Sequence, residues 1–232
     1  MGPTSSVSIY WILFIGVALL SWIVQASLKS KYRKYSKISL PSGLTGAQVA
    51  QKMLQENGIY DITVTSTKGT LTDHFNPTTK TVNLSRDVYG GTSIMAAAVA
   101  AHECGHAVQH ASEYGPLKLR STLVPVVSFA SNWVMWVLLG GMLLLNVFPS
   151  LMLMGIILFA LTTLFSFITL PVEINASKRA LAWLSSAGIT DYQTYPKAQD
   201  ALKAAAYTYV VAAISSLATL IYYITIFSSR RN

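Results

Sequence analysis

The sequence predicts a mainly α-helical protein in which about four membrane-spanning helices carry one small α+β unit outside the bilayer. Apolar residues make up 52% of the 232 residues and charged residues only 11%, whereas an ordinary soluble domain carries about 25% charged residues. Four long uncharged stretches explain this deficit better than an unusually large core would. The polar segment between the first two stretches has the length of a single small domain.

Each of the four apolar stretches is close to the length of about 20 residues that a helix needs to cross a bilayer. They cover residues 7–24, 123–147, 151–170 and 207–227. The first has no basic residue before it and five cations directly after it, the reverse of a secretory signal peptide, so we expect a retained anchor. The very short connection between the second and third stretches predicts an antiparallel helical hairpin.

Positive charge is concentrated in the two segments that lie on one side of such a four-helix arrangement. Eleven of the 17 Lys and Arg residues lie between the first and second spans, and four lie between the third and fourth. Because cationic loops tend to stay in the cytoplasm, both segments are predicted to be cytoplasmic. The net charge of +8 is interpreted as contact with the lipid bilayer, and no nucleic acid is expected as a partner. The cations after the first span are Lys29, Lys31, Arg33, Lys34 and Lys37.

The polar segment, residues 26–121, begins with a helix and a strand. Thr45 is a favourable N-cap for a helix with an apolar stripe, and Gly58 is a typical residue just beyond its end. Alternating Tyr60, Ile62 and Val64 then predict a strand.

A β-hairpin and a second helix follow. Residues 71–75 and 81–84 flank an Asn-Pro turn signal, which predicts the hairpin. Ser93 is placed to cap a helix that runs to Ala111. The residues with chemical potential lie on that helix.

His102-Glu103-Cys104-Gly105-His106 matches the HExxH pattern of zinc peptidases. Both histidines share one helix face, so both imidazoles can bind one zinc ion, and Glu103 lies beside the metal, where it can polarise a water molecule. The alternative is a pair of surface histidines near a glutamate, but the pattern arises by chance in roughly one such chain in a hundred or fewer. Gly105 either lets another backbone approach or is incidental. Cys104 is expected to point away from the zinc into the core.

A catalytic zinc needs a third protein ligand and an open position. His110 continues the row of His102 and His106, but three histidines in such a row span about 12 Å and cannot converge on one ion. Glu113 lies further along the same helix and has the same problem. Neither is expected to be the third ligand.

Glu173 is the best remaining candidate for the third ligand. We expect it in a loop just after the third span, on the same side as the motif helix, where an acidic residue needs a partner. Pairing with Lys178 or Arg179 explains its position equally well.

Five segments of the chain resemble the YugP-type neutral zinc metallopeptidases of bacteria. The likeness covers nearly the whole chain, from about Leu40 through the last span. It implies a membrane-bound gluzincin related in plan to the HtpX proteases, in which two HExxH histidines and a glutamate from a later helix bind zinc. The segments are GLTGAQVAQKML, LTDHFNPTTKTVNLSRDVY, AAAVAAHECGHAVQH, YGPLKLRSTLVPVV and LPVEINASKRAL.

Carried onto this sequence, the resemblance implies that His102, His106 and Glu173 bind Zn2+ and that Glu103 is the catalytic carboxylate. The expected reaction is hydrolysis of bonds in a peptide or membrane-protein substrate, with zinc as Lewis acid and Glu103 moving the proton. Quality control of membrane proteins is a role by analogy.

Two positions depart from the patterns of the relatives. Ser177 stands where the HtpX relatives have an aspartate, and Asn175 where the YugP pattern has one. Because such carboxylates orient metal-binding histidines, the resemblance leaves open which residue does so here. The oxyanion of the reaction needs a hydrogen-bond donor besides zinc. Arg179, Tyr207 and Tyr209 are the candidates, and the sequence does not choose between them.

The resemblance also gives the predicted hairpin a use. In related peptidases a strand before the motif helix presents its edge to an extended substrate, which main-chain hydrogen bonds hold. Leu71, Thr72, Asp73 and His74 are the candidates for this edge. The alternative is a strand that only covers the core.

Two other functions compete with that of a zincin-like peptidase. A site-2-type intramembrane protease carries its HExxH motif inside a spanning helix, but only about ten apolar residues run uninterrupted before His102, too few to span. A zinc-binding membrane scaffold or regulator without turnover is the other alternative.

These expectations divide the chain into five parts and place it in the cell membrane as a multi-pass protein with a cytoplasmic site. The parts are an N-terminal membrane anchor (1–28), a catalytic segment with the HExxH helix (29–121), a transmembrane hairpin (122–171), a cytoplasmic segment with the third zinc ligand (172–206), and the last transmembrane helix with the tail (207–232).

Overall fold

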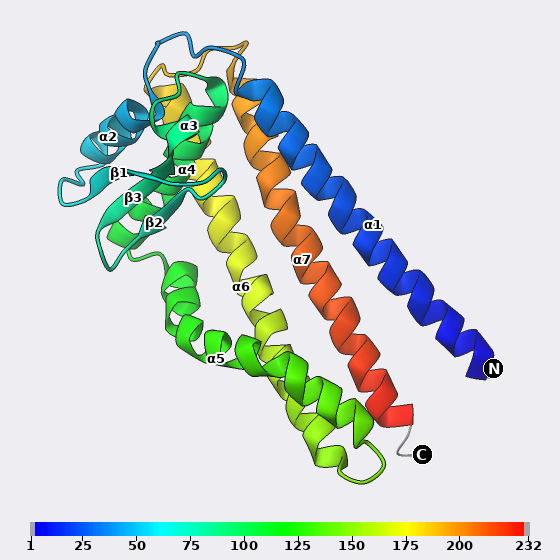
Figure 1. Ribbon diagram of the computed structural model, residues 1–232. Coiled ribbons are helices and arrows are strands. Elements are labelled where there is room, and N and C mark those ends of the chain that lie inside the picture. Colours follow the sequence, from blue (N-terminus) through cyan, green and yellow to red (C-terminus); the bar gives the residue numbers. More distant parts are fainter. Residues whose placement is uncertain (1–2, 230–232) are drawn as a thin grey trace. The chain divides into compact units, whose positions relative to one another are not determined.

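The computed structural model describes residues 3–229 and confirms a mainly helical chain with a small sheet (Figure 1). One long helix precedes the short elements of the polar segment, and three long helices follow them. In chain order the elements are α1 (Pro3–Tyr35), α2 (Gly46–Glu56), β1 (Thr63–Thr67), β2 (His74–Asn76), β3 (Thr81–Ser85), α3 (Arg86–Tyr89), α4 (Ile94–Ala111), α5 (Gly115–Leu143), α6 (Pro149–Ser186) and α7 (Tyr195–Ser229).

The chain divides into two compact units. One, called here the apolar unit, comprises Met1–Val24, Leu119–Leu170 and Thr208–Asn232. The other, called the α+β unit, comprises Gln25–Lys118 and Pro171–Tyr207. By sequence, the apolar unit carries only three charged residues, all arginine, while all nine carboxylates of the chain lie in the α+β unit.

Four of the described helices, α1, α5, α6 and α7, are long and apolar enough to cross a membrane. Their mean hydropathies over the best windows range from 1.7 to 2.4. The predicted number of spans is thus confirmed. Three of the helices run beyond the stretches that predicted them at both ends, whereas α5 begins before its stretch and ends at Leu143, four residues before the predicted end.

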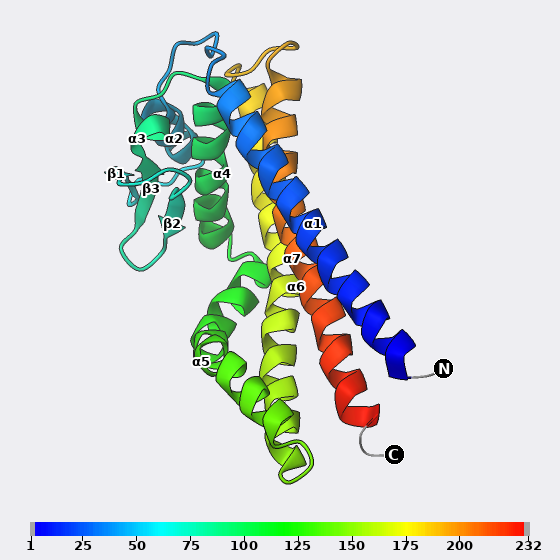
Figure 2. The same cartoon turned by 45° about the vertical axis from the view of Figure 1, so that its right-hand side comes forward.

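Within the apolar unit, α5 and the first part of α6 form the predicted antiparallel hairpin (Figure 2). Glycine permits their close approach, since a Cβ atom at Gly141 would lie 2.6 Å from the Cα atom of Met152. Leu138, Met152 and Ile156 are buried beside this contact. Small residues that let two helix backbones approach closely are typical of helix association in lipid.

The sheet of the α+β unit has the strand order β1-β3-β2. β2 and β3 pair antiparallel with Asn76 opposite Thr81, which confirms the hairpin. β1 pairs parallel to β3, a pairing that the sequence did not predict. β1 also begins only at Thr63, so the expected strand start at Tyr60 was wrong, and that tyrosine is exposed.

Both predicted N-caps are present in the α+β unit. The hydroxyl of Thr45 accepts a hydrogen bond from the backbone of Gln48, and the backbone N–H of Thr45 donates one to the side-chain oxygen of Gln48, a complete capping box at the start of α2. Ser93 accepts from the backbone of Ala96 at the start of α4. Gly58 follows α2 with a φ of 71°, a backbone conformation that favours glycine.

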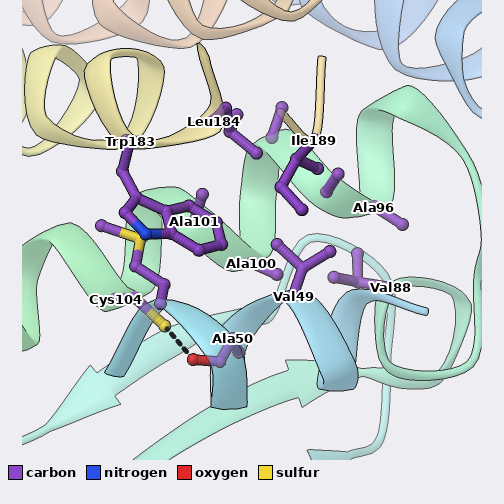
Figure 3. Close-up of a cluster of buried hydrophobic side chains, with 14 of the residues drawn as sticks. Val49, Ala50, Val88, Ala96, Ala100, Ala101, Cys104, Trp183, Leu184 and Ile189 are labelled. Carbon is purple, nitrogen blue, oxygen red and sulfur yellow. Dashed lines mark hydrogen bonds between the residues drawn. The ribbon is translucent and has the colours of Figure 1, made fainter. Parts of the chain in front are cut away.

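The core of the α+β unit forms where α4 packs between α2 and the later part of α6 (Figure 3). Val49 and Ala50 of α2 approach α4 from one side, and Trp183 and Leu184 of α6 approach from the other. Cys104 lies among them, fully buried, with its thiol 3.5 Å from the carbonyl oxygen of Ala50. The predicted core position of Cys104 is confirmed.

α6 corrects one expectation, because Glu173 lies within a helix and not in a loop. The helix continues through Pro171 to Ser186. Helices that contain proline are tolerated where packing compensates for the lost hydrogen bond. Here a stripe at intervals of four residues is completely buried after the proline, namely Val172, Ala176, Ala180 and Leu184.

Gly105 is the point of closest approach between α4 and α6. A Cβ atom at this position would lie 2.6 Å from the carbonyl oxygen of Ala176. This shows that the glycine within the motif serves a close backbone contact. The contact brings the motif face of α4 against the turn of α6 that carries Glu173.

Replacing Gly105 with alanine is expected to lower the thermal midpoint of unfolding. Alanine favours a helix by about 1 kcal/mol over glycine, but overpacking costs about 1–3 kcal/mol, and the obstructing atom belongs to backbone that cannot rotate away. Gly115→Ala is the matched control, since nothing lies within 4 Å of a Cβ atom there. Equal thermal midpoints for the two variants would contradict the role of this contact.

Candidate metal centre

His102, His106 and Glu173 meet at one point of the α+β unit. The Oε2 atom of Glu173 lies 3.3 Å from the Nε2 atom of His102 and 3.5 Å from the Nε2 atom of His106. The two imidazole rings stand nearly perpendicular, with centroids 4.8 Å apart. One ligand atom from each residue lies within 4.8 Å of the others. The structure therefore brings together the three residues that the sequence analysis singled out.

The burial of Glu173 calls for a positive partner. The residue is only 3% exposed, and its Oε2 atom has no hydrogen-bond donor. A buried carboxylate without compensation is strongly unfavourable. Glu173 pairs with neither Lys178 nor Arg179 in the ion pairs of the described chain.

The outer nitrogens of both histidines are held by hydrogen bonds. The hydroxyl of Ser177 lies 3.1 Å from the Nδ1 atom of His102, and the Oε1 atom of Gln109 lies 3.0 Å from the Nδ1 atom of His106. Both rings thus turn their Nε2 atoms towards Glu173. Ser177 and Gln109 therefore contact the two histidines in the orienting role that the resemblance left open.

Gln109 was missed by sequence reasoning, although a signal existed. It lies three residues after His106, on the same face of α4. It is a polar residue in a helix that is otherwise apolar or small outside the HExxH motif and His110. It is completely buried, which marks it as a partner to another buried polar group.

The donor set fits a zinc ion. In a tetrahedral site with bonds of about 2.0–2.1 Å, neighbouring ligand atoms lie about 3.3–3.4 Å apart. The measured distances of 3.3 and 3.5 Å from Glu173 to the two histidines match this spacing. Two imidazoles and one carboxylate leave one position of the tetrahedron for water or substrate, as in catalytic zinc sites.

Glu103 follows His102 on α4 and is buried. Its charge acts on His106. Burial by itself lowers the pKa of His106, but the close contact with the Glu173 carboxylate and the charge of Glu103 raise that pKa above the ordinary value. Glu103 is therefore close enough to influence the imidazole electrostatically.

His110, on the motif helix, and Glu113, just after the end of that helix at Ala111, lie outside the cluster. His110 is exposed, with its ring 5.8 Å from that of Phe75. Glu113 is exposed and forms an ion pair of 2.9 Å with Lys118. Neither residue belongs to the group of potential metal ligands.

The four residues proposed for the substrate edge lie in and before β2. Only His74 belongs to the strand, and it is exposed, with its Nδ1 atom 2.8 Å from the carbonyl oxygen of Thr72. Leu71 precedes the strand with a φ of 60°. Asp73 accepts hydrogen bonds from the backbone and hydroxyl of Ser85 in the neighbouring strand.

Arg179, one of the three candidates for the oxyanion donor, is linked to His106 through Asn175 and Gln109. Its Nε atom donates to the side-chain oxygen of Asn175 at 2.8 Å. Tyr207 is 57% exposed at the end of the α+β unit. Tyr209 belongs to the apolar unit.

Comparison with known proteins agrees with a membrane protein that carries a zinc site. Residues 10–228 match the family described as "Putative neutral zinc metallopeptidase". The chain is 46% identical to the "Putative membrane protease YugP" of Bacillus subtilis (strain 168), over 95% of this chain and 98% of that protein. No solved structure gives a significant match.

The chain belongs to this family of zinc metallopeptidases. The family and the four apolar helices identify it as a multi-pass membrane protein. The donor set at the centre agrees with the zinc ion that the family implies.

Purified wild-type protein is expected to contain about one zinc per chain. Glu173→Ala should lose most of this zinc, because two histidines alone hold the ion weakly, whereas His110→Ala should retain it. Metal content measured by mass spectrometry after dialysis distinguishes the two. Loss of zinc from His110→Ala with retention in Glu173→Ala would overturn the assignment.

Cys104 is expected to be unreactive in the folded protein. Complete burial raises the pKa of its thiol far above the ordinary value, and the thiolate is the reactive form. Titration with a maleimide in detergent should modify Cys104 only after unfolding. Stoichiometric modification of the native protein would contradict its place in the core.

Proposed function

We propose that this protein is a zinc-dependent endopeptidase of the HExxH gluzincin type. The observation that carries the proposal is that His102 and His106 both face a buried carboxylate oxygen of Glu173 that lacks a donor. One ligand atom from each of the three residues lies within 4.8 Å of the others. Two helices far apart in sequence supply this set. The family membership of the chain supports the same reaction.

The chain's own residues divide the work of peptide hydrolysis. His102, His106 and Glu173 would hold a zinc ion, which when bound would supply a Lewis acid for the scissile carbonyl and lower the pKa of the attacking water. Glu103 takes a proton from the attacking water on its carboxylate and passes it to the departing amine.

β2 is the best place for an extended peptide or membrane-protein substrate. It is an edge strand of the sheet, and it contacts α4, the helix that carries the motif. An added strand would satisfy its free main-chain groups with little dependence on side chains. His74 is the residue of the proposed edge that lies within the strand itself.

An intramembrane protease of the site-2 type fits the structure less well. α4 is not among the four described helices that are apolar and long enough to span a membrane. Its buried residues pack in the core of the α+β unit. We therefore place the reaction at the membrane but outside its hydrocarbon interior, where processing of membrane proteins is the corresponding role.

Glu103→Gln is expected to abolish cleavage while leaving zinc bound. The amide cannot accept the proton, so activity against casein should fall by at least about 100-fold. Glu113→Gln is the control, since that carboxylate is exposed and outside the cluster. Full activity of a purified Glu103→Gln variant would refute the assigned role.

The α+β unit is expected to face the cytoplasm, because it carries most of the cations of the chain. A cysteine at the exposed position Lys68 should react with an impermeant maleimide in inverted vesicles but not in intact cells. A cysteine at the exposed Asn146, between α5 and α6, should show the reverse. The buried native thiol gives little background, and the opposite labelling pattern would invert the topology.

A further inference from the structure

We propose that Gln109 fixes the tautomer of His106, so that the lone pair of its Nε2 atom faces the metal position, and that Asn175 and Arg179 hold Gln109 in the required orientation. The inference rests on the proposed zinc function. It concerns hydrogen bonds among the chain's own residues, so it can be tested without a metal.

The first step follows from the backbone of α6. The Nε2 atom of Gln109 lies 2.8 Å from the carbonyl oxygen of Val172. A backbone carbonyl only accepts hydrogen bonds, so the amide nitrogen of Gln109 must point there. Its oxygen then lies at the Nδ1 atom of His106, 3.0 Å away. An amide oxygen cannot donate, and therefore the Nδ1 atom carries the hydrogen.

The second step concerns Asn175, which also fixes the orientation of the Gln109 amide. The same amide nitrogen donates to the Oδ1 atom of Asn175 at 3.0 Å. Asn175 could present either its oxygen or its nitrogen, but the Nε atom of Arg179 lies 2.8 Å from the same Oδ1 atom. A guanidinium only donates, so Arg179 fixes the asparagine. A reversed Gln109 would set its oxygen against two acceptors in a fully buried site.

The consequence appears at Glu173. With the hydrogen on Nδ1, the Nε2 atom of His106 has no hydrogen to give to the Oε2 atom 3.5 Å away. This agrees with the buried Oε2 atom having no donor. The other tautomer would donate to Glu173 and close the centre with an internal hydrogen bond. The network keeps both atoms available to a cation.

The two histidines are not equivalent in this respect. The partner of His102 is the hydroxyl of Ser177, which can both donate and accept. It therefore positions the ring without imposing a tautomer. His106 is the preorganised ligand of the pair.

The test reads the tautomer directly in metal-free protein. The chain has four histidines, so protein labelled with ¹⁵N-histidine in detergent gives few signals, and single substitutions assign them. Spectra recorded well above the ordinary histidine pKa of about 6.5 should show His106 protonated at Nδ1. Gln109→Leu, similar in volume, should shift it towards protonation at Nε2 and weaken zinc binding by about 10–100-fold in a chelator competition.

Arg179→Met and Lys178→Met form a matched pair on α6. Each removes one cation from adjacent positions, but only Arg179 contacts Asn175, while Lys178 is exposed. Arg179→Met should weaken zinc binding measurably without unfolding the protein, and Lys178→Met should not. Equal affinities for this pair would overturn the role of Arg179.

The inference on Gln109 fails if wild-type His106 carries its hydrogen on Nε2. It also fails if Gln109→Leu leaves both the tautomer and the zinc affinity unchanged. A wild-type protein that bound no zinc would instead refute the proposed function, and the tautomer measured in the metal-free protein would still decide this inference.

Discussion

The close contact of α4 and α6 is the constraint on which the rest of the site depends. Gly105 lies within the motif, and the space that its missing Cβ leaves is filled by the carbonyl group of Ala176. Only at this separation can Glu173 reach both imidazoles of α4. The same separation lets a side chain of α4 bond to the backbone of α6. Gly105, which is not a candidate ligand, thus sets the spacing between the candidate ligands on α4 and α6.

The charge of the buried Glu173 carboxylate then gives this packed site an affinity for a cation. A carboxylate oxygen buried without a donor, facing two imidazole nitrogens, would be an unfavourable group in a core. It persists because α6 is held independently by its apolar stripe, Ala176, Ala180 and Leu184 among it. The free energy of core packing therefore compensates for the cost of burying the Glu173 carboxylate, and a bound positive ion would remove that cost.

Local sequence patterns predicted local structure well. The caps at Thr45 and Ser93, the four spans and the spacing of the HExxH histidines all depend on neighbours within a few residues. The loop predicted around Glu173 was wrong because α6 continues through Pro171, a residue type that commonly ends helices. The buried residues beyond that proline recur at intervals of four, which is a helical period. The parallel pairing of β1 with β3 and the bond from Gln109 to α6 join distant segments, which no local pattern specifies.

The coordination of the bound metal tests the central claim most directly. X-ray absorption at the zinc edge counts imidazole ligands and distinguishes oxygen from sulfur. A centre built by α4 and α6 predicts two imidazoles, with oxygen ligands at about 2.0–2.2 Å and no sulfur. A sulfur ligand would have to come from the buried Cys104, and either that result or a single imidazole would contradict this account of the site.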